Sequence, residues 1–358
     1  MREIQRGNTN KVEGKNKNGW WLAALGLGAV TAYTILRRSR PLFDFQNKVV
    51  LITGGSRGLG LILARGLAKR GARIAICARN AEELQRAEAD LKTRGAEVFQ
   101  TVCDVRNQSE VKHAVEAVRN HYGQIDALIN NAGVIQVGPL ENQTQEDFET
   151  AMAIHFWGAF YMMQAVLPEM KQRGAGRIAN ISSIGGKMSV PHLAPYSASK
   201  FALVGLSGAM RVELEKDNIY VTTVCPGLMR TGSHVNAVFK GQNEKEFAWF
   251  SIGNSLPISS ISAERAAEQI IDSMTRGNAE LIISIQAKLA AKANALFPEL
   301  MADVFGLVNR VLPEAGGIGA GHALGKDSQS SLSPSFLTAL IDKESRQNNE
   351  LKPSEALN

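Results

Sequence analysis

The chain has 358 residues, of which 44% are hydrophobic and 21% charged, and its formal net charge is +6. These proportions are ordinary for a globular protein, and the length favours one domain with appendages over two full domains. The excess positive charge lies in residues 1–40, which hold eight Lys and Arg but only two Glu; the remaining chain is neutral, which argues against nucleic-acid binding.

An apolar segment without a charged side chain covers residues 20–36. Its 17 residues are at the short end of the ~17–25 that span a bilayer, and Trp20 and Trp21 lie at one edge as interfacial anchors do. We predict a transmembrane helix here, with a basic N-terminal segment over 1–19 before it and a linker over 37–47 after it. A cleaved secretory signal and a buried helix are the alternatives, and basic residues on both sides leave the orientation open.

After the linker, apolar runs of strand length alternate with helical patterns as far as about residue 285. The seven predicted strands cover 48–54, 72–79, 97–105, 126–133, 176–183, 219–227 and 279–284. The predicted helices cover 59–71, 81–95, 109–123, 146–174, 196–216 and 263–274. Strands that are apolar throughout and alternate with helices indicate a parallel sheet covered on both faces. We therefore predict an α/β fold, a Rossmann doubly wound parallel sheet of about seven strands, over residues 48–285.

Residues 286–358 form a predicted C-terminal extension. Apolar side chains three or four apart predict an amphipathic helix over 286–312, which Pro298 starts or kinks. This helix could lie on a membrane, cover the pocket or pack between subunits. The tail from Pro313 is rich in Gly and Ser, so we expect mostly loop apart from a short stretch near 335–343.

The three cysteines, Cys77, Cys103 and Cys225, each lie within or beside a predicted core strand. Buried cysteines in odd number indicate free, reduced thiols. Reduced thiols favour a domain that faces the cytosol, so we expect a single-pass membrane protein whose globular domain is cytosolic.

The sequence TGGSRGLG at 53–60 lies between the first predicted strand and the first predicted helix. Gly54, Gly58 and Gly60 permit a tight turn and a close approach of the backbone to a pyrophosphate at the helix N-terminus. A glycine-rich turn alone could be a simple connector, but its position between these two elements predicts a dinucleotide-binding loop.

Two arginines near this loop indicate which dinucleotide is bound. A site that prefers NAD usually has an acidic residue at the end of the second strand, whereas this chain has Arg79 there and Arg57 inside the glycine loop. Two guanidinium groups suit the 2′-phosphate of NADP(H), which we predict as the cofactor. Both arginines could instead be ordinary surface residues.

A tyrosine and a lysine four residues apart, Tyr196 and Lys200, lie in YSASK. On a helix this spacing places one above the other, and an ammonium beside a phenol lowers a phenol pKa that starts near ~10. Such a phenol can donate and accept a proton near neutral pH. A lone pair with this spacing is common, so the prediction depends on the cofactor loop found upstream.

Together these motifs resemble the short-chain dehydrogenase/reductase family. The matching pieces, in the family's order over residues 48 to about 285, are TGGSRGLG (53–60), CDV (103–105), NNAG (130–133), NISS (180–183), YSASK (196–200) and PGLMRT (226–231). The resemblance implies that Ser183 holds the substrate oxygen, Tyr196 exchanges the proton, and Lys200 holds the nicotinamide ribose and lowers the pKa of the tyrosine. Ser182 competes for the role of Ser183, but the separation of thirteen residues from Tyr196 favours Ser183.

The resemblance also implies a set of cofactor contacts. Asp104 and Val105 would contact the adenine, residues 131–133 the adenine ribose, and residues 226–231 the nicotinamide end. With the glycine loop and its arginines, the predicted cofactor-binding residues are Gly54, Ser56, Arg57, Gly58, Leu59, Gly60, Arg79, Asp104, Val105, Asn131, Ala132, Gly133, Tyr196, Lys200, Pro226, Gly227, Met229 and Thr231.

One position departs from the family pattern. Where the family often has an asparagine that holds a water connecting the lysine to solvent, this chain has His155. His155 could hold that water through a ring nitrogen or relay the proton itself, so it is a catalytic candidate together with Ser183, Tyr196 and Lys200. The alternative is a buried histidine that only packs.

Residues 233–257 follow the nicotinamide loop, where the family has its substrate lid. Five large apolar residues lie in this segment: Val235, Phe239, Phe247, Trp249 and Phe250. They predict an apolar pocket and a lipophilic substrate, although packing in the core is the alternative.

These predictions combine into an NADP(H)-dependent oxidoreductase. It would transfer hydride between nicotinamide and a carbonyl or secondary alcohol, with Tyr196 as the acid or base and without a metal. The resemblance implies a homo-oligomer. The alternative is a non-catalytic, membrane-anchored NADP(H)-binding sensor or scaffold, and the intact Ser183, Tyr196 and Lys200 count against it.

Overall fold

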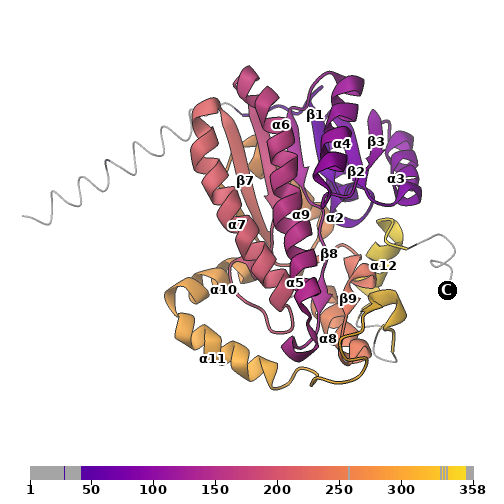
Figure 1. Ribbon diagram of the computed structural model, residues 1–358, viewed down its shortest axis with the longest axis vertical. Coiled ribbons are helices and arrows are strands. Elements are labelled where there is room, and N and C mark those ends of the chain that lie inside the picture. The colour runs from indigo at the N-terminus through magenta and orange to yellow at the C-terminus, as the bar shows by residue number, and fades with distance from the viewer. Residues whose placement is uncertain are drawn as a thin grey trace, which may run out of the picture. The chain divides into compact units, whose positions relative to one another are not determined.

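The computed structural model describes Gly28 and residues 42–256, 259–330, 333, 335 and 338–351. Its main sheet has seven parallel strands, each of which was predicted from the sequence. In chain order they are β1 (Val49–Thr53), β2 (Arg73–Ala78), β3 (Val98–Val102), β4 (Ala127–Asn130), β6 (Gly176–Ile181), β7 (Ile219–Pro226) and β11 (Glu280–Ile283). Across the sheet the order is β11-β7-β6-β4-β1-β2-β3, as expected of a doubly wound fold (Figure 1).

The central strands are apolar because both of their faces are covered. Every residue of β1 is buried, and Val50 pairs with Ile74 of β2 on one side and with Ala127 of β4 on the other. The chain adds strands outward from β1 in one direction as far as β3 and then in the other direction from β4. The strand order therefore reverses between β1 and β4, and a crevice opens at their carboxyl ends.

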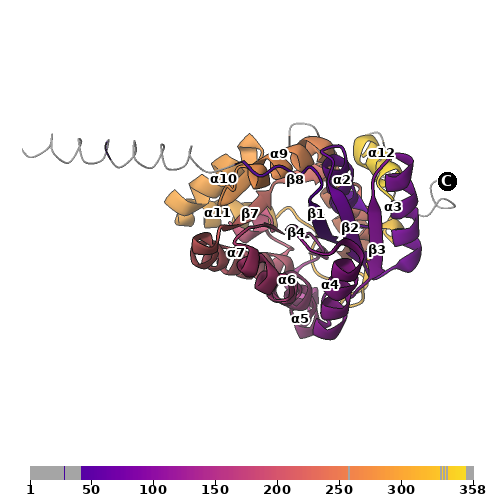
Figure 2. The same cartoon turned by 90° about the horizontal axis from the view of Figure 1, so that it is seen from above.

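Helices cover the sheet in two layers. One face carries α2 (Gly58–Ala68), α3 (Ala81–Thr93) and α9 (Ala263–Thr275). The other face carries α4 (Gln108–Tyr122), α6 (Ala159–Arg173) and α7 (Ala194–Leu214). Seen from above, α2 and α9 lie on one side of the strands and α4, α6 and α7 on the other (Figure 2). The two layers confirm the predicted α/β architecture.

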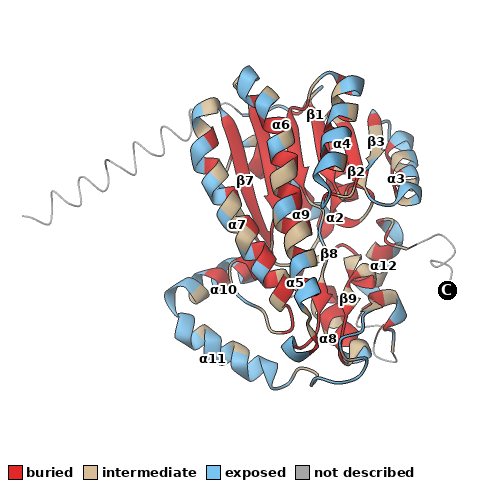
Figure 3. Cartoon of the chain, in the orientation of Figure 1, coloured by how far each residue is buried: buried red, intermediate tan, exposed pale blue. Residues whose placement is uncertain are grey.

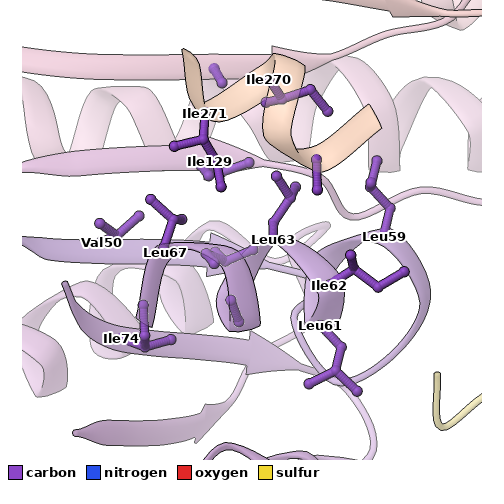
Figure 4. Packing of buried hydrophobic residues seen from close by; sticks show 14 of the residues in the cluster. Val50, Leu59, Leu61, Ile62, Leu63, Leu67, Ile74, Ile129, Ile270 and Ile271 are labelled. Carbon is purple, nitrogen blue, oxygen red and sulfur yellow. The ribbon is translucent and has the colours of Figure 1, made fainter. Parts of the chain in front are cut away.

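The contact between α2 and α9 forms the centre of one core, together with side chains of β1 and β4 (Figure 4). Leu63 and Leu67 of α2 and Ile270 and Ile271 of α9 are each at most 1% exposed. A Cβ at Gly66 would lie 2.9 Å from Cδ1 of Ile271, so this glycine lets the two helices approach closely. Burying one such side chain stabilises the fold by about 1.5–3 kcal/mol. This core therefore holds the helix that follows the glycine loop against the sheet.

Local signals determine the ends of α4. Asn107 precedes the helix in extended backbone, and its Oδ1 accepts hydrogen bonds from the N–H groups of Ser109 and Glu110. Gly123 ends the helix with a φ of 86°, a conformation that residues with a side chain rarely adopt.

The helix predicted over 146–174 is interrupted in the structure. α5 (Gln145–Met152) passes into a π-helical turn, η2 (Ala153–Gly158), before α6 begins. Such turns are rare and occur frequently at functional sites. This one contains His155, which it directs toward the crevice at the sheet.

Several short elements were not predicted. β5 (Gln136–Val137), β9 (Val238–Phe239) and β12 (Ala323–Leu324) form one small sheet, and β8 (Leu228–Arg230) pairs with β10 (Ser260–Ser262). Within the expected lid, α8 (Asn243–Ser255) is a helix. Strands of two or three residues are too short to show a periodic pattern of apolar side chains, which explains why they escaped detection.

The C-terminal extension begins with two exposed helices. α10 (Ile285–Leu296) and α11 (Pro298–Asn309) are separated by Phe297, so Pro298 starts a helix, which was one of the two predicted options. α11 contains no buried residue and is exposed at every position except Met301 and Phe305, which are half-buried (Figure 3). In the tail beyond it, α12 (Ala339–Gln347) overlaps the short stretch expected near 335–343, whereas β12 was not predicted.

Within the described residues, no helix is both long enough and apolar enough to cross a bilayer. The transmembrane helix predicted over 20–36 lies outside those residues apart from Gly28, an exposed helical residue. The basic segment 1–19 and residues 37–41 of the linker also lie outside them.

Candidate active site

A cavity of about 980 Å³ opens at the carboxyl ends of the central strands. Most of the predicted site residues line it: Gly54, Ser56, Arg57, Gly58, Leu59, Arg79, Asp104, Val105, Asn131, Ala132, Gly133, His155, Tyr196, Lys200, Met229 and Thr231. Four predicted residues are not part of its lining: Gly60, Ser183, Pro226 and Gly227. The fold therefore brings motifs that are far apart in the sequence to one place.

The glycine loop between β1 and α2 requires glycine for two different reasons. Gly54 and Gly58 have φ values of 63° and 53°, in the left-handed region that favours glycine. Gly60 has a packing role, because a Cβ there would collide with the carbonyl oxygen of Gly54. A backbone cradle at the start of a helix fits the pyrophosphate of a dinucleotide.

Asn131 fastens this loop to the sheet. Its Nδ2 donates hydrogen bonds to the carbonyl oxygens of Thr53 and Gly54, both at 3.1 Å. The Oγ1 of Thr53 accepts hydrogen bonds from the N–H groups of Asn131 and Ala132, both at 3.0 Å. These four bonds hold the ends of β1 and β4 together beside the cavity.

Tyr196 and Lys200 project from the first turns of α7 toward the end of β6. The Nζ of Lys200 donates a hydrogen bond to the carbonyl oxygen of Ile181 at 2.8 Å and lies 5.5 Å from the centre of the Tyr196 ring. Ser183 follows β6, and its Oγ accepts a hydrogen bond from the N–H of Gly185 at 3.1 Å. The Ser183 hydroxyl lies beside the Tyr196 phenol. The serine, tyrosine and lysine predicted as catalytic are thus neighbours.

Ser182, the competing serine, has a structural partner. It is buried, and its Oγ donates a hydrogen bond to the carbonyl oxygen of Lys200 at 3.0 Å. This bond joins the end of β6 to α7, whereas the hydroxyl that lies beside the Tyr196 phenol is that of Ser183. The arrangement favours Ser183 as the serine of the site.

Burial changes the protonation of both ionisable groups. Burial raises the pKa of the Tyr196 phenol, and the adjacent Ser183 hydroxyl opposes that increase. Burial also lowers the pKa of the Lys200 ammonium to about 7. The predicted lowering of the tyrosine pKa is not met, because desolvation of the phenol outweighs the effect of its neighbours. The phenol therefore stays protonated at neutral pH, as a proton donor must.

Both ring nitrogens of His155 are engaged by the protein. Nε2 accepts a hydrogen bond from the N–H of Val134 at 3.1 Å, so the ring proton lies on Nδ1, which faces the Oγ of Ser199 at 2.7 Å. The Ser199 hydroxyl in turn donates to backbone carbonyls of α7. Burial, with the nearby Lys200 charge, keeps the pKa of His155 well below its usual value. The ring is neutral, and these contacts favour a positioning role over the predicted water-holding or proton-relay role.

The arginines predicted to bind the 2′-phosphate differ in their surroundings. Arg57 forms ion pairs with Glu83 at 3.3 Å and with Glu350 at 3.4 Å. Arg79 is exposed at the mouth of the cavity. Glu350 also lines the cavity, although nothing in the sequence marked it as a site residue.

The apolar residues of the expected lid form a core and do not line the cavity. Phe239, Phe247 and Phe250 are buried together with Val137 and Leu193. The prediction that the lid residues shape an apolar pocket was therefore wrong for these side chains, because their rings pack against one another.

The three cysteines are free and buried, as predicted. A hydrogen bond with Cys103, together with burial, raises the pKa of Cys77, and burial raises the pKa of Cys225 to about 12. Such thiols stay protonated at neutral pH and are poor nucleophiles.

Comparison with known proteins bears on these motifs. A model of the family described as short chain dehydrogenase matches residues 48–241. Gluconate 5-dehydrogenase of Gluconobacter oxydans is 36% identical over 190 residues, which are 53% of this chain and 74% of that protein. A dehydrogenase/reductase SDR family protein 7-like of Drosophila melanogaster is 31% identical over 77% of this chain and 85% of its own length. Among solved structures, a variant of actinorhodin polyketide ketoreductase with NADPH has a TM-score of 0.58 and 33% identity, covering 66% of this chain and 95% of its own.

Proposed function

The chain belongs to the short-chain dehydrogenase family, and on that premise we propose that it is an NADP(H)-dependent oxidoreductase of carbonyl groups or secondary alcohols. The observation that carries the proposal is that Tyr196 and Lys200 line a cavity together with the glycine loop, and that Ser183 lies beside the Tyr196 phenol. Hydride transfer to a carbonyl needs a place for the cofactor and a proton donor beside it. The glycine loop, which can cradle a pyrophosphate, and the protonated Tyr196 phenol provide these two parts in one cavity.

The side chains of this site handle the proton and the substrate oxygen. A bound nicotinamide supplies or accepts the hydride. Tyr196 donates its proton to the oxygen as negative charge develops there, and Ser183 donates a hydrogen bond to the same oxygen. The Lys200 ammonium lies close enough to favour the phenolate that remains. In the oxidative direction the same phenolate accepts the proton of the alcohol.

The preference for NADP(H) rests on Arg57 and Arg79. Both line the cavity, and the chain has Ala78-Arg79 where an NAD-preferring site carries an acid. A 2′-phosphate would replace a carboxylate partner of Arg57 and find Arg79 accessible. The similar ketoreductase structure contains NADPH, which agrees with this assignment.

A lipophilic substrate is supported by the apolar side chains that line the cavity, which include Val134, Ile135, Met229, Val238 and Leu324. None of them belongs to the five apolar residues on which the sequence prediction relied, although Val238 lies in the same segment. Apolar lining with a few hydrogen-bonding groups is typical of a pocket for an apolar ligand.

We also propose that residues 20–36 anchor the chain in a membrane as a single pass, with the domain in the cytosol, and that the protein is a homo-oligomer. The uncharged segment and the free thiols support the first two points. Alkaline extraction of membranes should retain the full chain and release a chain that lacks residues 1–41. Sedimentation of the released chain should show a dimer or larger species, and a monomer would contradict the oligomer.

The activity test is NADPH oxidation with carbonyl substrates graded in chain length, with NADH in parallel. Turnover should increase with apolar chain length, and Tyr196→Phe should reduce it about 10²–10⁴-fold while cofactor affinity is kept. Tyr161→Phe, on α6, is the matched control and should stay near the activity of the unchanged chain. NADPH binding without turnover of any carbonyl would favour a non-catalytic sensor. A preference for small polar carbonyls would contradict the lipophilic substrate.

A further inference from the structure

The chain returns to the glycine loop with a segment that begins at the last residue of α12. We call residues 347–351 the C-terminal strap. In both views α12 lies next to α3, on the side of the sheet where the glycine loop begins α2 (Figures 1 and 2). The strap is therefore close to the predicted phosphate site although it is nearly the last part of the chain that the structure describes.

Backbone groups of the glycine loop are already hydrogen-bonded to the strap. The N–H of Gly58 donates to the carbonyl oxygen of Asn348 at 2.9 Å. The Nδ2 of Asn349 donates to the carbonyl oxygens of Ser56 at 2.8 Å and of Glu83 at 3.0 Å. The strap thus occupies an N–H group at the start of α2, where a dinucleotide phosphate would accept hydrogen bonds.

The carboxylate of Glu350 lies at the same place. Its side chain is only 2% exposed, pairs with the Nε of Arg57 at 3.4 Å and accepts a hydrogen bond from the Nδ2 of Asn236 at 2.7 Å. It lies directly against Gly58, because a Cβ on that residue would collide with its oxygen. A negative group at a helix N-terminus is favoured by the helix dipole, as a phosphate would be.

Two arginines outside the cavity bind the strap through hydrogen bonds. Arg65 of α2 donates to the side-chain oxygen of Asn348 at 2.9 Å and to the carbonyl oxygen of Gln347 at 3.0 Å. Arg86 of α3 donates to the side-chain oxygen of Asn349 at 2.7 Å. The strap is therefore seated by specific contacts with two helices.

We propose that the C-terminal strap is an autoinhibitory element that occupies the phosphate position of the cofactor site and must leave before NADP(H) binds. This inference rests on the proposed cofactor. Glu350 and a cofactor phosphate would compete for Arg57 and for the start of α2, and two anions in one buried place repel each other. Burial raises the pKa of Glu350 to about 6, although the positive charge of Arg57 opposes that increase. Burying the carboxylate therefore costs free energy, and this desolvation cost makes its release easier.

NADPH affinity of the full chain and of strap variants tests the proposal. A chain that ends at Arg346, or Glu350→Ala, should bind NADPH about tenfold more tightly in a fluorescence titration, because a site blocked nine-tenths of the time loses about that factor in apparent affinity. Arg86→Ala should shift affinity in the same direction without touching the cavity. Glu268→Ala, an exposed residue of α9, is the control and should leave the affinity unchanged.

Hydrogen exchange gives a second, independent result. Adding saturating NADPH to the full chain should accelerate exchange at the amides of residues 347–351. Slower exchange there, or weaker NADPH binding after truncation, would show that the strap closes over bound cofactor and would overturn the proposal. Equal affinities for the full and strap-free chains would also overturn it. If neither chain binds a nicotinamide cofactor, the proposed function fails with it, which separates the two outcomes.

Discussion

The Nδ1 of His155 lies 2.7 Å from the Oγ of Ser199, one turn along α7 from Tyr196, and Nε2 of the same ring accepts a hydrogen bond from the N–H of Val134. His155 therefore joins the loop after β4 to the helix that carries Tyr196. Its ring also meets the Tyr196 ring edge to face, with centres 5.5 Å apart. These contacts make it a positioning residue for Tyr196.

His155→Ala should lower kcat by about tenfold or more, because a small displacement of a catalytic group costs a large factor in rate. Affinity for NADP(H) should change less than kcat. The partly buried N–H of Val134 would lose its acceptor, at about 1 kcal/mol of stability. Steady-state kinetics and thermal unfolding measure the two effects.

The pH dependence of kcat separates positioning from proton relay. Since the ring is neutral, His155→Ala should keep the same ionisations in the profile, and His155→Asn, which retains an acceptor, should restore part of the rate. A lost ionisation would support relay. A wild-type kcat in His155→Ala would contradict both roles.

Lys200→Met should stabilise the protein most at low pH. The folded-state pKa of about 7 lies below the ordinary 10.5, so between these values the folded chain binds fewer protons than the unfolded chain and stability rises with pH. Below pH 7 the native protein carries a buried charge, at a penalty of the order of several kcal/mol. Melting curves from pH 6 to pH 10 should show a gain that shrinks as pH rises, whereas Lys112→Met on the exposed face of α4 should show no such trend. A gain of equal size at every pH would contradict the assignment.

Arg79→Ala should raise the KM for NADPH by about 10- to 100-fold, because a hydrogen bond to a charged group contributes about 1.5–3 kcal/mol. The KM for NADH should stay nearly constant, since that cofactor lacks the 2′-phosphate. Arg94→Ala, another exposed arginine that follows α3, is the matched control. An equal increase in KM for the two cofactors would show that Arg79 does not bind the 2′-phosphate.

Leu63→Ala should destabilise the fold by about 2–5 kcal/mol, because it leaves a cavity where α2 packs against α9. Leu289→Ala, at a position of α10 that is 63% exposed, should stay within about 0.5 kcal/mol. Urea unfolding measures both. A large loss for Leu289→Ala would mean that α10 is covered in solution, as it would be at a subunit interface.

The sheet could be predicted because each central strand follows a local rule. Strands such as β1 and β7 are covered on both faces and are therefore apolar at nearly every position. The proximity of Ser183, Tyr196 and Lys200 could be predicted for a similar reason, because they lie in short motifs near the carboxyl end of a strand and the start of a helix.

The strap and the aromatic cluster could not be predicted in the same way. Glu350 is a polar residue in a polar tail, and only the tertiary fold places it beside Arg57 and Asn236. Phe247 and Phe250 are apolar residues that suit a core or a pocket equally well, so their burial depends on neighbours that come from other segments.

The position of the strap in the chain has a consequence for synthesis. Strand β11, which ends at Ile283, completes the sheet, and roughly 70 further residues separate it from Glu350, which take several seconds to translate at about 5–20 residues per second. During that interval the glycine loop can fold against the sheet while nothing covers it. A chain made where NADP(H) is abundant could thus bind the proposed cofactor before the strap is synthesised. The conditions during synthesis would then decide whether a new molecule begins with cofactor or with the strap at the start of α2.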